Sequence, residues 1–329
     1  YNAPDPDLRL DDVAQVEVVR GPQGALYGSG SLGGVVQIVS RQPDPSAWTA
    51  EATVGTSATA GGDPSSLVGA VVNAPFGSGR GAVRLVGYRE AAGGWLDSPA
   101  LGRNANSTVR EGLRVLAKGE LASGWSLSGG GVAQSIASAD AQYVSPPGSR
   151  TRPGRLAEPH DNDFGAGHLT LTGDLGWAGL TLTTAVIEHH LSSRYDASEA
   201  PPVPIGPGPA AFDDDNRVGA WVSEATLAGG APGGVGWIAG AFAATTRQEV
   251  SLDLVRPTAP GAPLWSERRR DRLQELALFG EVTTPLGQDL ALTLGGRLSV
   301  SHNDTDSRIS VPGAPVSAFR DETSRNRFA

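Results

Sequence analysis

The segment VAQVEVVRGPQGALYGSGSLGGVVQIVSR, residues 13–41, decides how the rest of the chain is interpreted. Two runs rich in β-branched residues, at 16–19 and 35–39, flank a centre that has glycine at 21, 24, 28, 30, 33 and 34. Such runs bounded by glycine predict short strands with tight turns between them. Pro22 ends the first run because proline has no amide hydrogen to donate to a strand ladder.

Residues 28–33 of this segment spell G-x-G-x-x-G, which is a dinucleotide-binding fingerprint where it joins a strand to a helix. The residues that follow, VVQIVS, are β-branched and have no helical period. No helix N-terminus is therefore expected to hold a pyrophosphate there. Nucleotide binding is not predicted.

The same segment resembles the last part of the plug domain of TonB-dependent outer-membrane receptors. The family pattern runs through V-E-V, R-G-P-Q-G, L-Y-G and a later G-G before a second β-branched run. The plug-motif residues in this chain are Glu17, Arg20, Gly21, Pro22, Gln23, Gly24, Tyr27, Gly28, Gly33 and Gly34. The resemblance covers about thirty residues. It implies a transporter of the outer membrane that is energised through TonB.

The resemblance also implies that Arg20 meets acidic groups on the inner wall of the barrel. The carboxylates expected on that wall are Glu111, Glu120, Glu275 and Glu281, although Glu111 shares the apolar parity of its strand. A buried, paired arginine would seat the plug and give TonB a contact to release. The alternative is a solvated charge in the lumen.

Composition excludes several classes of protein. The 329 residues contain no cysteine, so neither a disulfide framework nor a thiolate metal site is available. The net charge of −9 argues against a nucleic-acid partner. There is no run of 18 apolar residues and thus no predicted transmembrane helix. No Ser/His/Asp or paired-carboxylate motif stands out, so we predict no enzyme, no cofactor and no metal.

From Trp48 onward, apolar and polar residues alternate with period two, which predicts strands. In 109–121, Val109, Leu113 and Val115 fall on one face, and Arg110 and Arg114 fall on the other. The predicted strands are 47–58, 65–75, 80–91, 108–121, 125–137, 163–173, 179–191, 217–228, 236–252, 273–284 and 289–302, with a twelfth beginning near 319.

Short and long connections alternate between these strands. The long ones are 92–107, 138–162, 192–216, 253–272 and 303–318. An outer-membrane barrel has short periplasmic turns and long extracellular loops, whereas a soluble sandwich has no reason to sort its loops. Tryptophans near predicted strand ends suit an aromatic girdle at the membrane interface, with ordinary core packing as the alternative; they are Trp48, Trp125, Trp177, Trp221 and Trp237.

The predicted fold is therefore all-β: a transmembrane antiparallel β-barrel with part of an N-terminal plug domain. The plug resemblance implies about 22 strands in the full protein, of which about 11–12 lie here. We predict the end of the plug at 1–43 and the first half of the barrel at 44–329. We interpret the chain, which opens at Tyr1 and has no methionine, as a fragment without its signal peptide or its TonB-contacting segment.

The candidate ligand contacts lie in the predicted extracellular loops and near the strand ends beside them. Histidine can ligate a metal or a ferric chelate, and an arginine cluster can attract an anionic siderophore or lipopolysaccharide phosphates. The candidates are His160, His189, Trp265, Arg268 and Arg270. The acidic run 213–216 could bind a hard cation, but it lacks the spacing of a known loop.

The predicted function is TonB-dependent uptake of a scarce nutrient, with a ferric siderophore as the first choice of substrate. Cobalamin, saccharides and aromatic compounds remain open as substrates. The predicted partners are TonB, outer-membrane lipid or lipopolysaccharide, and the transported ligand. A passive porin would share the barrel pattern without the plug motif, and a soluble β-rich binding protein would share the alternation without the sorted loops.

Overall fold

The computed structural model describes residues 5–21, 33–144, 146–199, 208–231, 233–258, 261–287 and 290–328. Within these ranges, the chain forms two antiparallel sheets and one turn of 3-10 helix, η1 (Gly77–Gly79). No helix in the described ranges is long and apolar enough to cross a membrane. The plug-motif residues Pro22, Gln23, Gly24, Tyr27 and Gly28 lie outside the described residues.

The smaller sheet pairs the two strands predicted from the plug motif, β1 (Val13–Arg20) and β2 (Gly34–Ser40). They are antiparallel, with Val18 opposite Val36 and Arg20 opposite Gly34. Gly34 has φ +129°, and a Cβ there would lie 2.3 Å from the carbonyl oxygen of Val19. Only glycine fits this close approach, which explains one glycine of the motif.

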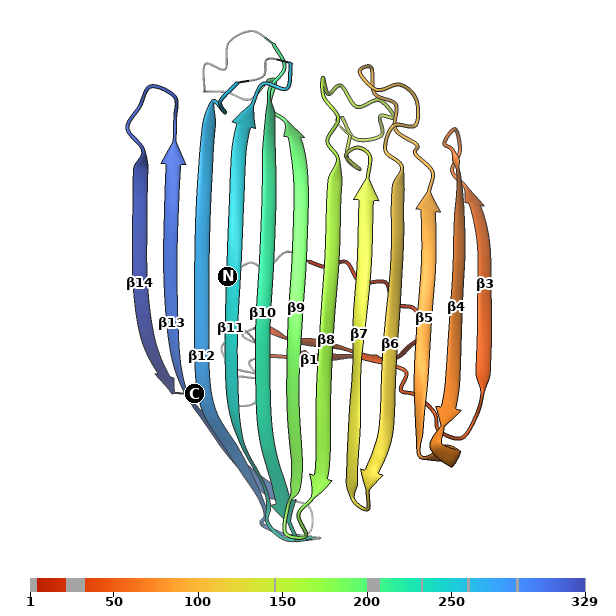
Figure 1. Ribbon diagram of the computed structural model, residues 1–329, viewed down its shortest axis with the longest axis vertical. Coiled ribbons are helices and arrows are strands. Elements are labelled where there is room, and N and C mark those ends of the chain that lie inside the picture. The colour runs from red at the N-terminus through yellow and green to blue at the C-terminus, as the bar shows by residue number, and fades with distance from the viewer. Residues whose placement is uncertain are drawn as a thin grey trace.

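The larger sheet has twelve strands in sequence order, each antiparallel to the next. Figure 1 shows it as a curved wall, with β1 and β2 running across one of its faces. Its strands are β3 (Thr49–Ala58), β4 (Pro64–Phe76), β5 (Gly81–Ala92), β6 (Thr108–Ala122), β7 (Trp125–Ser138), β8 (His160–Asp174), β9 (Gly179–Asp196), β10 (Ala211–Gly230), β11 (Gly236–Val255), β12 (Trp265–Pro285), β13 (Ala291–Ser310) and β14 (Ser317–Phe328).

The sorting of short and long connections is confirmed. From β4 onward, connections of two to five residues at one end of the wall alternate with longer ones at the other end, at the top of Figure 1. Several strands extend further toward the long connections than predicted. β12 begins at Trp265 and not at 273, and β10 begins at Ala211 and not at 217. These extensions are polar on both faces, so they carry no period-two signal, and cross-strand ion pairs accompany them.

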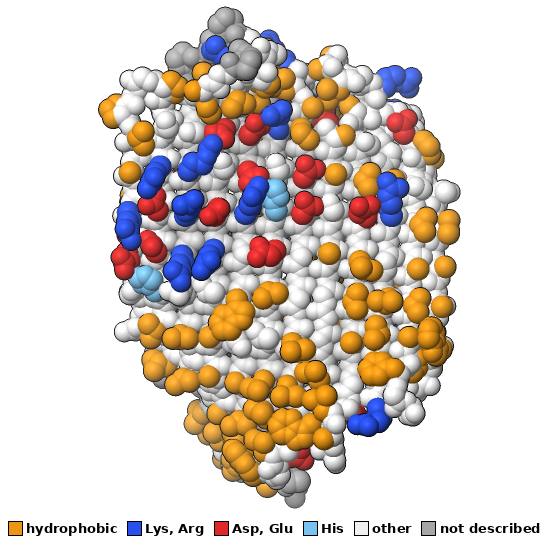
Figure 2. Space-filling model, viewed as in Figure 1, with side chains coloured by type: hydrophobic (Ala, Val, Ile, Leu, Met, Phe, Trp, Pro, Cys, Tyr) orange, Lys and Arg blue, Asp and Glu red, His pale blue; other side chains and the backbone are white. Residues whose placement is uncertain are grey.

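The two faces of the wall differ in polarity as the alternation predicted. The face turned away from the plug strands carries a belt of exposed large apolar side chains, such as Leu276 and Leu278 on β12, which are 65% and 63% exposed. Figure 2 shows this belt over the lower half of that face and rows of charged side chains over the upper half. An apolar belt of this kind is the surface that a barrel presents to lipid.

Aromatic side chains lie at both ends of the apolar belt. Trp177 and Trp237 stack with their ring centroids 6.1 Å apart near the short turns, and Trp177 is 65% exposed. Trp221 lies toward the charged rows and is 42% exposed. Trp48, 71% exposed, immediately precedes β3. Exposure of these rings favours the interfacial girdle over core packing.

Candidate functional site: the contact between the plug segment and the inner wall

Residues 5–12, which precede β1, lie against the inner face of the wall and are held there by side chains of four strands, β5 to β8, and by their own. Asn162 on β8 donates from Nδ2 to the carbonyl oxygen of Asp5 at 3.1 Å. Gln134 on β7 donates from Nε2 to the carbonyl oxygens of Pro6 and Asp7 at 3.0 and 3.1 Å. All of these bonds are accepted by backbone carbonyl oxygens of the segment and none by its side chains. They therefore fix the path of the backbone.

Arg9 is the cation of the segment, and it bonds in several directions. Its backbone amide donates to Oε1 of Gln134 at 3.1 Å, and the Tyr88 hydroxyl donates to the same oxygen at 2.6 Å. The Arg9 guanidinium pairs with Asp11 at 2.5 Å and with Glu90 on β5, and it lies 5.6 Å from the centroid of the Tyr88 ring. One arginine therefore connects the segment to β5 and β7.

Asp12 forms the most buried ion pair of this contact. Its carboxylate is 5% exposed and accepts two bonds from Arg84 on β5, at 2.7 and 2.6 Å. Arg114 on β6 lies 3.7 Å from the same carboxylate and also donates to the carbonyl oxygens of Asp11 and Asp12 at 2.7 and 3.2 Å. A planar guanidinium suits this two-pronged grip on a carboxylate.

Apart from the pair between Arg9 and Glu90, the ion pairs between the segment and the wall have the opposite polarity to the one that the motif suggested. Barrel arginines hold plug aspartates here, and Arg110 on β6 adds a pair with Asp7. Arg20 is exposed and has no carboxylate in ion-pair distance among the described residues, so its pairing stays a prediction. Arg110 and Arg114 were placed on the polar face of their strand from the alternation, but nothing in the sequence assigned them a partner.

The four carboxylates expected on the inner wall are divided between the two faces. Glu275 lies on the inner face and pairs with Arg297 at 2.9 Å. Glu111 lies on the outer face, as its parity indicated, and pairs with Arg89 at 3.4 Å. Glu120 and Glu281 share the parity of the inner face in β6 and β12. None of the four meets Arg20 within the described part of the chain.

His189 is a candidate loop contact that also falls inside the predicted strand 179–191, and the structure places it on the strand. It lies on β9, is 5% exposed, and its Nε2 is 2.8 Å from Oδ1 of Asn162. Phe164 packs edge-on against its ring at 5.5 Å. Asn162 also donates to the carbonyl oxygen of Asp5. His189 therefore orients the Asn162 side chain that binds the plug segment. The strand continues past its predicted end at 191 because residues 192–196 pair with β10, and the first two of them also pair with β8.

The other candidate ligand contacts also lie on strands and not in loops. His160 begins β8, and its Nδ1 is 2.7 Å from the Ser193 hydroxyl. Trp265, Arg268 and Arg270 belong to β12, where polar residues on both faces hid the strand. Trp265 stacks on Phe212 at 6.2 Å on the inner face. The structure does not bring the five candidates together, and ligand contact by any of them stays a prediction.

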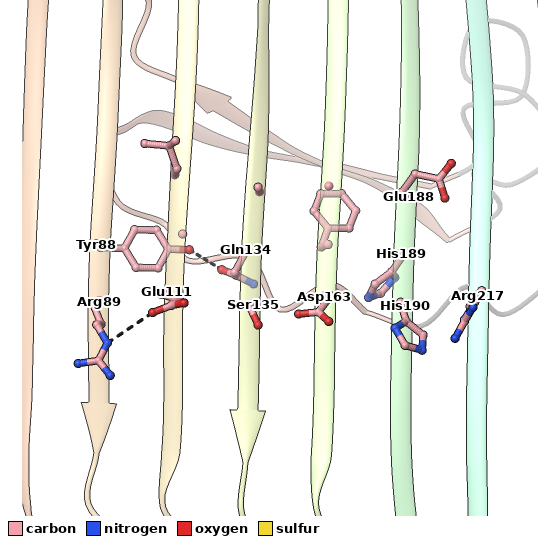
Figure 3. Close-up of a pocket in the computed structure, with 15 residues that line it drawn as sticks. Tyr88, Arg89, Glu111, Gln134, Ser135, Asp163, Glu188, His189, His190 and Arg217 are labelled. Atoms are coloured by element: carbon pink, nitrogen blue, oxygen red, sulfur yellow. Dashed lines mark hydrogen bonds and ion pairs between the residues drawn. The ribbon is translucent and has the colours of Figure 1, made fainter.

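Figure 3 shows how neighbouring residues of one strand separate onto the two faces. Tyr88, Gln134 and His189 belong to the inner face, where Tyr88 and Gln134 are bonded. A row of side chains crosses β5 to β10 on the outer face: Arg89, Glu111, Ser135, Asp163, His190 and Arg217. This row lines a shallow depression of about 690 Å³.

The acidic run 213–216 forms ion pairs and not a cation site. Asp213 accepts two bonds from Arg194 at 2.7 and 2.9 Å, and Asp215 is 2.7 Å from Nε2 of His190. No group of three or more His, Asp or Glu in the described residues has the geometry to hold a metal ion.

The long connection 139–159 is ordered by a buried ion-pair cluster. Arg152, 5% exposed on its side chain, pairs with Asp140 at 3.1 Å and with Glu158 at 2.9 Å. The Tyr143 hydroxyl donates to Glu158 at 2.6 Å. Burial of that hydroxyl and its bond to Glu158 raise the pKa of Tyr143 to about 12. Ion pairs and hydrogen bonds therefore define the conformation of this connection at the long-loop end of the wall.

A second arginine joins this connection to its neighbours. The Arg150 guanidinium donates to the carbonyl oxygens of Trp95, Ala60 and Gly61 at distances down to 2.6 Å. Asn106 accepts the backbone amides of Trp95 and Leu96 at 2.8 Å each. Three successive connections at the long-loop end thus form one structured rim above the plug contact.

A half-open antiparallel wall with an apolar outer belt, polar inner face and inserted plug strands defines the class of plugged outer-membrane β-barrels. Comparison with known proteins agrees. Residues 2–35 match the model of the TonB-dependent Receptor Plug Domain. The pesticin receptors of Yersinia enterocolitica and Yersinia pestis are 57% identical over 35 residues, which are 11% of this chain and 5% of theirs.

The match to solved structures extends over almost the whole chain. The ferric yersiniabactin uptake receptor of Yersinia pestis superposes with a TM-score of 0.79 at 19% identity, covering 96% of this chain and 48% of that one. The ferric-catecholate import receptor of E. coli K12, in its open form, gives 0.69 at 16% identity, covering 96% and 56%. The chain therefore spans about half the length of the receptors it matches.

Residues 2–35 therefore match a TonB-dependent receptor plug domain, and the twelve-stranded wall has the fold of about half the barrel of such outer-membrane receptors. The fold class predicted from the sequence, an antiparallel β-barrel wall with a plug segment at its N-terminus, is confirmed. The domain boundary at residues 43 and 44 stays a prediction; the structure separates β2 from β3 over 41–48.

Proposed function

We propose that the receptor containing this chain carries out TonB-dependent active transport across the outer membrane, with a ferric siderophore as its substrate. The likeness to receptors named for ferric yersiniabactin and ferric catecholates supports this choice of substrate class. Ligand enters from the long-loop end, and force applied through TonB frees a path past the plug.

The observation that carries the proposal is the polar seat of residues 5–12 on the inner wall. Residues 5–12 contact the wall through hydrogen bonds and ion pairs and not through packed apolar side chains. When the segment moves, each lost bond is replaced by one to water, so the net cost of a typical bond is only about 0.5–1.5 kcal/mol. Such a seat holds the plug at rest and releases it under a directed pull.

The test is uptake in the native cell under iron limitation. Cells with the receptor gene intact, deleted, or intact with TonB disabled are given radiolabelled iron as catecholate, hydroxamate or carboxylate complexes. We expect one complex to be taken up only when both the receptor and TonB are present. Labelled cobalamin and a labelled oligosaccharide are run in the same strains as alternative substrates.

Each arm of this experiment has a distinct meaning. Receptor-dependent uptake that persists without TonB contradicts active transport and favours a passive pore. TonB-dependent uptake of cobalamin or the oligosaccharide keeps the transport mechanism and replaces the siderophore. Uptake of every complex at equal rates with and without the receptor contradicts both parts of the proposal.

A further inference from the structure

The outer face of β10 to β13 carries a second polar site, above the apolar belt and on the opposite side of the wall from the plug. Twelve charged side chains line a depression of about 760 Å³ there. Among those with outward parity, six are arginines and four are carboxylates. The arginines are Arg217, Arg247, Arg268, Arg270, Arg272 and Arg308, and the carboxylates are Asp215, Glu249, Asp304 and Asp306.

Most of these arginines are already neutralised. Arg268 pairs with Asp253 at 2.8 Å and Arg270 pairs with Glu249 at 3.4 Å. Arg217 pairs with Asp215 at 3.2 Å, and Arg308 pairs with Asp306 at 3.5 Å. Two arginines, Arg247 and Arg272, remain for some other anion.

Arg247 on β11 and Arg272 on β12 are directly opposite in the antiparallel register, and both are exposed. Neither has a carboxylate in ion-pair distance among the residues that the structure describes; Asp304, across from Arg272 on β13, pairs with Arg320 at 3.8 Å. Like charges directly opposite each other destabilise a sheet. An anion held between the two guanidinium groups removes that repulsion.

The height of the pair along the wall identifies the anion. Arg272 lies four residues from Leu276, the nearest large apolar side chain of the outer belt on β12. At a rise of about 3.4 Å per residue and a tilt of about 40°, this places the guanidinium roughly 10 Å beyond the edge of the belt. That is the level of lipid headgroups on the long-loop side, where the charged row of Figure 2 begins.

We propose that Arg247 and Arg272 together bind a phosphate group of lipopolysaccharide in the outer leaflet. Arginine presents paired N–H donors that match phosphate oxygens, and two guanidinium groups balance the charge of one phosphate monoester. The transported ligand passes on the other side of the wall, so this site serves the membrane surface and not the cargo.

The experiment measures binding of three probes to the detergent-solubilised full-length receptor. The probes are lipopolysaccharide with its phosphates intact, the same lipopolysaccharide after phosphatase treatment, and inorganic phosphate. We expect the Arg247→Gln/Arg272→Gln double variant to bind intact lipopolysaccharide roughly tenfold or more weakly than the unmodified receptor, because charge-assisted hydrogen bonds are lost. The Arg89→Gln/Arg194→Gln double variant removes two outward arginines that are already paired, and it should keep the original affinity.

A second readout separates this site from a structural role. Without lipid, the Arg247→Gln/Arg272→Gln variant should melt at the same temperature as the unmodified receptor or higher, because a like-charge pair has gone. If it fails to fold, Arg247→Lys/Arg272→Lys retains the charge without the planar fork and should bind with reduced affinity. The proposal is overturned by unchanged binding in these variants, by equal binding of the dephosphorylated probe, or by inorganic phosphate binding as tightly as the lipid.

Discussion

Asp12 shows at the scale of one residue how the plug is held. Its backbone has a positive φ of 55°, an uncommon conformation that aspartate tolerates better than most residues. This turn separates the segment on the wall from β1 and directs the carboxylate toward Arg84 and Arg114. A single side chain thus ties the entry to the plug strands to two neighbouring barrel strands.

Replacing Asp12 by asparagine should therefore loosen the plug. Removing one partner of a buried ion pair leaves uncompensated charge and typically costs about 3–5 kcal/mol. We expect the Asp12→Asn receptor in planar bilayers to open a conducting path at a lower urea concentration than the unmodified receptor. Asp7→Asn is the matched control, because Asp7 is 61% exposed and an exposed pair contributes only about 0–1 kcal/mol. Equal midpoints for Asp12→Asn and Asp7→Asn would show that burial of the pair does not matter.

Tyr143 gives a prediction about pH at the mouth of the wall. Its folded pKa of about 12 lies above the ordinary value near 10, so the neutral hydroxyl is favoured in the folded connection. The stabilisation is fully present below pH 10 and is lost as pH rises toward 12. Absorbance titration should show Tyr143 ionising late, and Glu158→Gln should return its pKa toward 10. An unchanged titration in the Glu158→Gln variant would assign the shift to burial alone.

At the scale of elements, alternation located the twelve wall strands because lipid and lumen select opposite side chains in the belt. It failed at the upper ends of β8 to β13, where both faces are wet. The run ERRRDR at 267–272 has no apolar parity to read, and its pairing rests on the neighbouring strands. A strand is recognised in a sequence when its two faces differ in polarity. Where both faces are polar, the sequence of a strand resembles that of a loop.

The cost of placing a charge on the outer face of one strand should depend on how far the position lies from the apolar belt. We expect Leu278→Arg, in the belt of β12, to destabilise the receptor in lipid by about 2–4 kcal/mol. Gln274→Arg is the control on the same face of the same strand, four residues closer to the charged rows, and should cost about 0–1 kcal/mol. Urea unfolding in lipid vesicles measures both variants. Equal costs would mean that the exposed leucines do not face hydrocarbon.

At the scale of the whole molecule, the plug contact depends on the meeting of segments far apart in sequence. Asp12 and Arg84 are 72 positions apart, and Asn162 reaches a carbonyl 157 positions away. The motif at 13–41 identified the plug, and the alternation identified the wall, but neither specifies how one is placed against the other. For this reason the motif predicts an ion pair for Arg20, whereas the observed pairs are made by aspartates just before β1.

Transport through this wall should require residues 5–12 to leave it, which a reversible cross-link can test. The chain has no cysteine, so Asp7→Cys and Arg110→Cys place two new thiols in it at an observed ion pair. A bifunctional methanethiosulfonate reagent joins them, and a reductant separates them. We expect the cross-link to abolish TonB-dependent uptake and reduction to restore it, because the segment is then free to exchange its wall contacts for water.

The matched control joins two wall strands to each other. Arg89→Cys and Glu111→Cys replace an outer-face ion pair of similar geometry on β5 and β6, 3.4 Å apart in the native chain. Linking them leaves the plug free, so uptake should continue at the rate of the unlinked receptor. If the link between residues 7 and 110 also leaves uptake intact, the segment stays on the wall during transport, and the path must open between the plug strands and the part of the lumen that residues 5–12 do not touch.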